Sequence, residues 1–152
     1  MSESPPRRAT HDDVEGIRRL VAAAFGKYVE RIGRPPAPMS ADYAELLVTS
    51  RVWVLDHGDE IVGVLVTQAQ RDHLLLDVVA VAPTAQGGGH GRVLLERADQ
   101  DAREQGLPEV RLCTNEAMTE NLEFYPRRGF HEVSRGVEDG YHRVFFAKAV
   151  SA

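Results

Sequence analysis

The chain has 152 residues, of which 43% are hydrophobic, and a formal net charge of −5. Its length favours one domain, and its acidic balance argues against nucleic-acid binding and suits a cationic partner. No apolar run reaches the roughly 20 residues that a membrane-spanning helix needs, and the first residues lack the apolar segment of a signal peptide. With one cysteine and so no internal disulfide, the protein is expected to be cytoplasmic and not to associate with membranes.

The first third of the chain predicts a short strand and two amphipathic helices. Apolar residues recur at helical spacing after Thr10, which can cap the first turn, and Gly33 ends this helix. A proline-rich loop follows, and Ser40 can cap the second helix. In order, the predicted elements are a disordered tail at residues 1–6, a strand at 7–9, a helix from 11 towards 32 and a helix at 41–49.

The middle of the chain predicts strands. A turn at residues 57–59 joins strands at 51–56 and 60–68 into a hairpin. Residues 73–81 are apolar at both alternating sets of positions, with Asp77 as the interruption. Such a pattern is typical of a central strand that is covered on both sides.

A glycine cluster, two helices and three strands complete the chain. The helix after the cluster extends to about Gln105, and its charged residues are expected to form a solvated surface. Cys113 is interpreted as a small core residue, and Pro126 is expected to end or kink the short helix near Phe124. The last elements are strands at 109–114, 131–137 and 141–149 and the short helix at 117–124. The element order predicts an α/β (mixed α+β) fold with helices on both faces of one sheet, in a single domain over residues 7–152.

The glycine cluster between the central strand and the next helix predicts an anion site. The first turn of a helix has backbone N–H groups without partners, and the helix dipole makes that end partly positive. Glycines allow positive φ and the close approach of a phosphate. The spacing matches neither the P-loop nor the Rossmann fingerprint, and a plain surface turn is the alternative. The residues expected at a pyrophosphate are Gln86, Gly87, Gly88, Gly89, His90, Gly91 and Arg92, of which His90 and Arg92 are equally open to interpretation as solvent-exposed.

Two motifs in this order resemble those of one family. The pattern Gln-x-x-Gly-x-Gly at Gln86, Gly89 and Gly91, after a strand that ends in Ala-Val-x-Pro, resembles the coenzyme A loop of the GNAT superfamily of N-acetyltransferases. The segment that runs from Tyr125 to Phe130 is similar to the family's Tyr-x-x-x-Gly-Phe motif. The resemblance implies a mostly antiparallel seven-stranded GNAT-type sheet. It also implies direct transfer of an acetyl group from acetyl-CoA to a primary amine in a ternary complex, without a metal.

The resemblance also implies a course for the cofactor. The pantetheine arm would bond to the backbone of the central strand at Val79 and Val81, on either side of Ala80. A β-bulge in this strand would separate it from the strand at 109–114. Asn121 lies one helical turn before Tyr125 and is expected to bond the pantetheine amides.

Two residues match the family's acid and base positions. Asp77 interrupts an apolar strand and is the candidate general base, with a structural carboxylate or a water chain as alternatives. Tyr125 is the candidate acid for the departing thiolate, with a core tyrosine as the alternative.

The acceptor amine is not identified by the sequence. Fold analogy alone suggests the residues that line its site, which are Tyr28, Arg31, Met39, Tyr43 and Tyr141. Both a small molecule and a peptide stay open as the acceptor. The family resemblance also makes a homodimer an expectation. Two rival interpretations are a non-catalytic acetyl-CoA-binding or sensing module and a nucleotide-binding domain.

Overall fold

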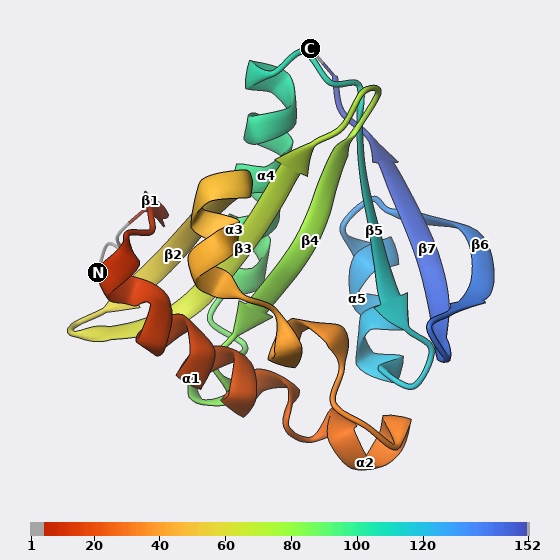
Figure 1. Cartoon of the computed structure of the whole chain (residues 1–152). Coiled ribbons are helices and arrows are strands. Elements are labelled where there is room, and N and C mark those ends of the chain that lie inside the picture. Colours follow the sequence, from red (N-terminus) through yellow and green to blue (C-terminus); the bar gives the residue numbers. More distant parts are fainter. Residues whose placement is uncertain (1–4, 152) are drawn as a thin grey trace.

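The computed structural model describes residues 5–151, so most of the predicted disordered tail, residues 1–4, lies outside the described residues. Seven strands form one sheet in the order β1-β2-β3-β4-β5-β7-β6, with helices on both faces (Figure 1). The strands are β1 (Arg7–Arg8), β2 (Arg51–His57), β3 (Glu60–Ala69), β4 (Leu74–Val81), β5 (Glu109–Asn115), β6 (His131–Glu138) and β7 (Tyr141–Ala149). The helices are α1 (Val14–Phe25), α2 (Tyr28–Ile32), α3 (Tyr43–Thr49), α4 (His90–Glu104) and α5 (Thr119–Arg127). The predicted fold class is confirmed, and only the β4–β5 pair is parallel.

Two apolar cores lie on opposite faces of the sheet. On one face α1 and α3 pack against β2, β3 and the end of β4, around Ile17, Val21 and Tyr43. On the other face α4 and α5 pack against the start of β4 and against β5 and β7, around Leu94 and Phe146. Figure 1 shows α1 and α3 in front of the sheet and α4 and α5 behind it.

Strand β4 contains a β-bulge, as the family resemblance implied. Val66 of β3 pairs with Val78, whereas the next residue, Thr67, pairs with Leu76. Asp77 is therefore the extra residue, opposite no residue of β3. The one residue that breaks the apolar pattern of this strand is the residue at the bulge.

The bulge exchanges the two faces of β4. Before it, Leu74 and Leu76 belong to the core under α4 and α5. After it, Val78 and Ala80 belong to the core under α1 and α3. Without an extra residue, these four side chains would lie on one face, because alternate residues of a strand point the same way.

Strands β4 and β5 separate soon after they meet. They pair only at Leu74 with Val110 and at Leu75 with Arg111. Beyond that point β4 remains paired with β3, and β5 remains paired with β7. The two strands diverge towards the bottom of Figure 1, as the family resemblance implied.

Two predicted helix boundaries differ from the structure. Ser40 does not cap the second helix, because the prolines of the preceding loop place it in a 3-10 turn, Ala37–Ser40. Asp42 is the cap instead, and its carboxylate accepts a hydrogen bond from the backbone N–H of Glu45 at 3.2 Å. The first helix is interrupted between α1 and α2, although Gly33 ends α2 as predicted, with φ of 90°.

Pro126 was expected to end or kink the short helix near Phe124, and the expectation that the helix ends there is wrong. Helix α5 continues through Pro126 to Arg127. The Tyr125 ring packs at 5.6 Å from the Phe130 ring and at 5.8 Å from the Phe146 ring, measured between centroids. We attribute the helical geometry of Tyr125 to this packing, since the restriction that proline places on its neighbour is a preference of moderate size.

Cys113 is exposed and is not a core residue, so that interpretation was also wrong. Its neighbours in the strand are buried. Leu112 points into the core under α4 and α5, and Thr114 points towards α5. Cys113 points to the other face of β5. There the separation of β4 from β5 leaves the strand uncovered.

The charged surface expected on α4 is partly buried. Asp101 is fully buried, and its carboxylate accepts hydrogen bonds from Trp53 Nε1 and Thr67 Oγ1, both at 2.9 Å. The same carboxylate forms an ion pair with Arg97 at 2.8 Å. These contacts fix α4 against β2 and β3, and they therefore help to position the first turn of that helix.

We predict that Asp101→Ala lowers the free energy of unfolding by about 3–5 kcal/mol, because buried donors and a cation lose their partner. Urea unfolding followed by circular dichroism measures the change. Glu96→Ala, on the exposed face of the same helix, is the control and should change it by about 0.5 kcal/mol or less. Equal effects of the two substitutions would contradict this role for Asp101.

Candidate active site

A cavity of about 810 Å³ lies between the end of β4 and α5. The loop before α4, the first turn of α4 and the α1–α2 region complete its wall. Eleven residues that the sequence analysis assigned to the cofactor line this cavity. They come from the end of β4, the glycine loop, the start of α4 and α5, and they are Val79, Ala80, Val81, Gln86, Gly87, Gly89, His90, Gly91, Arg92, Asn121 and Tyr125. Gly88 was assigned with them and does not line the cavity.

The glycine loop presents backbone amides to this cavity. Gly87 and Gly89 have φ values of 89° and 83°, a backbone conformation that residues other than glycine rarely adopt. Gly89 is the N-cap of α4, so the N–H groups that follow it have no partner within the helix. Gly91 lies against the Phe124 ring, and a Cβ there would be 3.1 Å from Phe124 Cζ. A phosphate fits this positive, glycine-lined end of a helix.

The free edge of β4 lies beside the same cavity. The Ala82 N–H donates to the Val62 carbonyl of β3 at 2.8 Å. Because peptide groups alternate along a strand, those of Val79 and Val81 point away from β3, towards the space left by β5. The Gln86 side chain donates to the Val81 carbonyl at 3.3 Å, which agrees with this direction. An extended chain of amides could pair with this edge as an added strand does.

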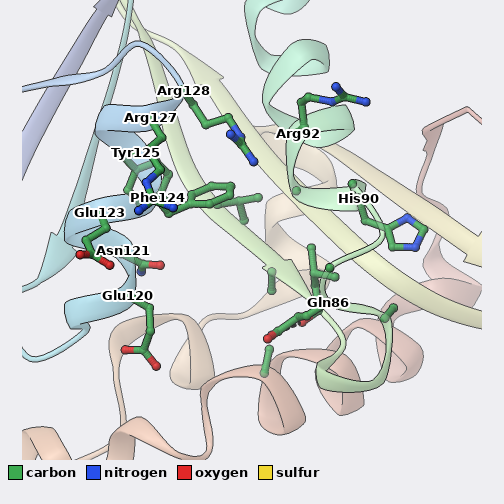
Figure 2. A pocket seen from close by; sticks show the side chains of 18 of the residues that line it. Gln86, His90, Arg92, Glu120, Asn121, Glu123, Phe124, Tyr125, Arg127 and Arg128 are labelled. Atoms are coloured by element: carbon green, nitrogen blue, oxygen red, sulfur yellow. Dashed lines mark hydrogen bonds between the residues drawn. The ribbon is translucent and has the colours of Figure 1, made fainter.

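Arginine side chains line the end of the cavity nearest α4. Arg92, Arg127 and Arg128 line it, and the Arg128 guanidinium carbon lies 4.9 Å from the centroid of the Phe124 ring. Figure 2 shows Arg128 and Phe124 pointing across the cavity towards the start of α4, and the His90 ring on the side of its loop away from α5. The cavity end nearest α4 is therefore suited to a ligand with several negative charges.

The other end of this cavity is bridged by ion pairs. Glu120 of α5 pairs with Lys27 at 3.2 Å and with Arg31 at 2.7 Å. The Arg31 guanidinium, which is the larger influence, and the Lys27 ammonium lower the pKa of Glu120 to about 2. The carboxylate is therefore charged at neutral pH, and it links α5 to the α1–α2 region.

A second cavity of about 240 Å³ lies between the separated strands β4 and β5 and the loop before α3. The two cavities share part of their walls, and the shared residues are Phe25, Val79, Asn121 and Tyr125. A ligand in each cavity could therefore meet the other at these residues.

Asp77, the residue at the bulge, lines the second cavity and is exposed within it. The surrounding protein limits the hydration of its carboxylate and raises its pKa above the usual range. A carboxylate with a raised pKa is a stronger base, so Asp77 is suited to accept a proton from a ligand in this cavity.

Tyr125 and Asn121 lie where the cavities meet. Burial raises the pKa of the Tyr125 hydroxyl, so this group is protonated at neutral pH and can donate a proton. The Asn121 side-chain nitrogen donates to Thr114 Oγ1 at 3.0 Å. Its carbonyl oxygen remains on the cavity side of this contact as a candidate acceptor.

The five residues that fold analogy suggested for the acceptor are dispersed. Tyr141 lines the second cavity and Tyr28 lines the first. Arg31, Met39 and Tyr43 line neither cavity. Tyr43 is fully buried, and its hydroxyl donates to the Pro38 carbonyl at 2.6 Å.

Several lining residues were missed by the sequence analysis. Arg143 and Cys113 line the second cavity, and Lys27, Phe124 and Arg128 line the first. For Arg143 a signal existed, since the predicted last strand alternates and places it on the same face as Tyr141. For Lys27 and Phe124 no local pattern was informative, because their positions depend on how helices distant in sequence meet.

Comparison with known proteins agrees with this geometry. A family model described as an acetyltransferase (GNAT) domain matches residues 49–132, more than half of the chain. The chain therefore belongs to the GNAT acetyltransferase family. YxbD of Bacillus subtilis (strain 168), an uncharacterized protein, is 25% identical over 111 residues, which are 73% of this chain and 67% of YxbD.

Solved structures share the fold at low sequence identity. The PaiA N-acetyltransferase from Thermoplasma acidophilum, in complex with coenzyme A, has a TM-score of 0.80 at 15% identity, over 98% of this chain and 99% of that one. The ribosomal-protein-S18-alanine N-acetyltransferase from Escherichia coli has a TM-score of 0.77 at 19% identity, over 97% and 94% of the two chains.

Residues 5–151 show neither a candidate membrane-spanning helix nor a candidate metal-binding group. No helix among them is both long and apolar enough to cross a bilayer. In the same range, no group of three or more His, Cys, Asp or Glu side chains is arranged to hold a metal ion.

We predict that Gly91→Val weakens coenzyme A binding by about tenfold or more, because its side chain displaces the Phe124 ring into the cavity. The measurement is the rise in melting temperature with coenzyme A, which follows from mass action. Gly136→Val is the matched control, since Gly136 lies on the exposed strand β6, outside the cavity wall, and a Cβ there would meet no atom within 4 Å. Equal protection of both variants, or equal protection by ATP and NAD, would contradict the assignment of this cavity.

Proposed function

We propose that the protein is an N-acetyltransferase that moves the acetyl group of acetyl-CoA directly to a primary amine in a ternary complex. One observation carries the proposal, namely that two cavities beside the separated strands meet at Tyr125 and Asn121. Membership of the GNAT acetyltransferase family supports the choice of acyl donor.

The larger cavity would hold acetyl-CoA. Its pyrophosphate would bind the amides between Gly87 and Arg92, and its pantetheine arm would lie along Val79 and Val81. The thioester would then reach Tyr125, at the wall that both cavities share. A backbone N–H of the β4 edge would stabilise the oxyanion that forms on the thioester carbonyl.

The smaller cavity would hold the amine next to Asp77. An alkyl ammonium has a pKa of about 10.4, so little neutral amine exists at pH 7 without a base. Asp77 would take one proton, directly or through water, while the nitrogen attacks the thioester carbon. General base catalysis of this kind contributes about 10²–10⁴ in rate.

Tyr125 would complete the reaction. As the new C–N bond forms and the C–S bond breaks, the electron pair of the latter goes to sulfur. The thiol of free coenzyme A is the product after the Tyr125 hydroxyl gives its proton to this thiolate. The second proton of the nitrogen leaves to solvent as the C–S bond breaks. Solvent then returns a proton to the tyrosine, and the Asp77 proton leaves to solvent, so that an ammonium and a thioester give an amide, a thiol and one proton.

We predict that Tyr125→Phe lowers kcat by about 10²-fold or more while the Kd for acetyl-CoA changes by about threefold or less. Phenylalanine keeps the ring contacts with Phe130 and Phe146 and removes only the hydroxyl. Coenzyme A release measures turnover, and calorimetry measures binding. A kcat close to that of the unaltered protein would assign Tyr125 to the core instead.

Initial rates distinguish direct transfer from its alternatives. Varying acetyl-CoA at several amine concentrations should give intersecting double-reciprocal lines. Parallel lines would indicate an acetylated protein intermediate. Binding of acetyl-CoA without turnover of any amine would favour the non-catalytic module.

The raised pKa of Asp77 predicts a pH dependence. The base is active only when deprotonated, so kcat/KM should rise with pH through the pKa of Asp77, above the ordinary value of about 3.9 for an aspartate. Asp77→Asn should remove this acidic limb and lower the plateau by about 10²-fold. Rate profiles of the two proteins test this, and an unchanged limb in the variant would assign it to another group.

A further inference from the structure

The second cavity contains one uncompensated charge. Two charged side chains line it, Asp77 and Arg143. The Arg143 guanidinium is paired with Glu138 at 2.7 Å. Within residues 5–151, no cation forms an ion pair or hydrogen bond with Asp77. Because Glu138 offsets the charge of Arg143, the charge that remains unpaired at the cavity wall is the negative charge of Asp77, at the bulge.

The rest of the cavity is mainly apolar and small. Side chains such as Phe25, Pro38, Leu112 and Met118 form its wall. Its volume of about 240 Å³ lies below the range of roughly 300–1,000 Å³ that drug-sized ligands occupy. An occupant that fills it has few heavy atoms and an apolar body.

The loop before α3 and the β6–β7 hairpin, which both contribute to the cavity wall, contact each other. The Tyr141 hydroxyl, on the β6–β7 hairpin, donates to the Pro35 carbonyl of the loop before α3 at 2.6 Å. The Arg34 guanidinium carbon lies 3.5 Å from the centroid of the Tyr141 ring. These contacts hold the loop and the hairpin at a fixed separation, which favours a small ligand over an extended peptide.

We propose that the acceptor is a small primary monoamine with an apolar body and no carboxylate, bound with its ammonium group against Asp77. This inference rests on the proposed function and specifies the substrate class of the same site. A carboxylate on the ligand would lie in a cavity that is already negative, because Glu138 neutralises Arg143. A second ammonium on the ligand would be desolvated without a partner carboxylate.

The substrate panel uses amines that differ in one group. Phenethylamine is the expected acceptor, phenylalanine adds a carboxylate to the same body, 1,4-diaminobutane replaces the body with a second amine, and a tripeptide presents its N-terminus. The kcat/KM for phenethylamine should exceed those of the other three by about tenfold or more. A higher kcat/KM for any of the other three overturns this inference and leaves the proposed function standing.

A binding measurement separates failure of the inference from failure of the proposed function. Cys113, the single cysteine of the chain, is exposed and lines the second cavity, so its alkylation by iodoacetamide at mildly alkaline pH reports occupancy. Phenethylamine should slow this alkylation, whereas phenylalanine should not. Protection by phenethylamine without turnover supports the acceptor class and rejects the catalytic proposal. Absence of protection overturns the acceptor class.

Two variants test the charges separately. Asp77→Asn should raise the phenethylamine concentration needed for half protection by about tenfold or more. Asp59→Asn, on the exposed β2–β3 turn, is the matched control and should leave it unchanged. Glu138→Gln releases Arg143 and should increase protection by phenylalanine relative to phenethylamine by about threefold or more. An unchanged phenylalanine-to-phenethylamine ratio in this variant would overturn the charge argument.

Discussion

The structure depends on one extra residue in the central strand. Because Asp77 has no partner on β3, the strand exchanges its faces at that point and contributes to both cores. The same irregularity coincides with the place where β4 leaves β5. A regular strand would have continued the sheet and closed the space that now forms two cavities. The bulge also places the only carboxylate of the strand in the wall of the smaller cavity.

The two cavities have opposite electrostatic character. The larger one ends at a helix N-terminus with glycine amides and three arginines, which suits a polyanion. The smaller one has an uncompensated Asp77, which suits a cation. Reactants of opposite charge would therefore bind in different cavities and meet beside Tyr125. This division explains how an acidic protein can have a strongly cationic binding site at one place on its surface.

Local patterns in the sequence predicted the seven strands and the glycine loop, because strand alternation and glycine-rich helix starts are encoded by neighbouring residues. The bulge was implied by the family resemblance alone. Where a feature depends on contacts between residues that are far apart in the sequence, the sequence analysis missed it or predicted it wrongly. Tyr125, before Pro126, is held in a helix by the rings of Phe130, just before β6, and Phe146 of β7, and Asp101 is buried by donors from β2 and β3. Cys113 is exposed because β4 departs from its side. The homodimer and the cytoplasmic location stay predictions.

The central claim is that separation of β4 from β5 creates the binding edge for the cofactor. A crystal structure with coenzyme A tests it most directly. The account predicts pantetheine amides within hydrogen-bond distance of the backbone of Val79 and Val81, with the pyrophosphate on the amides between Gly87 and Arg92. A pantetheine arm bound elsewhere, with this edge of β4 unoccupied or paired with protein, would contradict it.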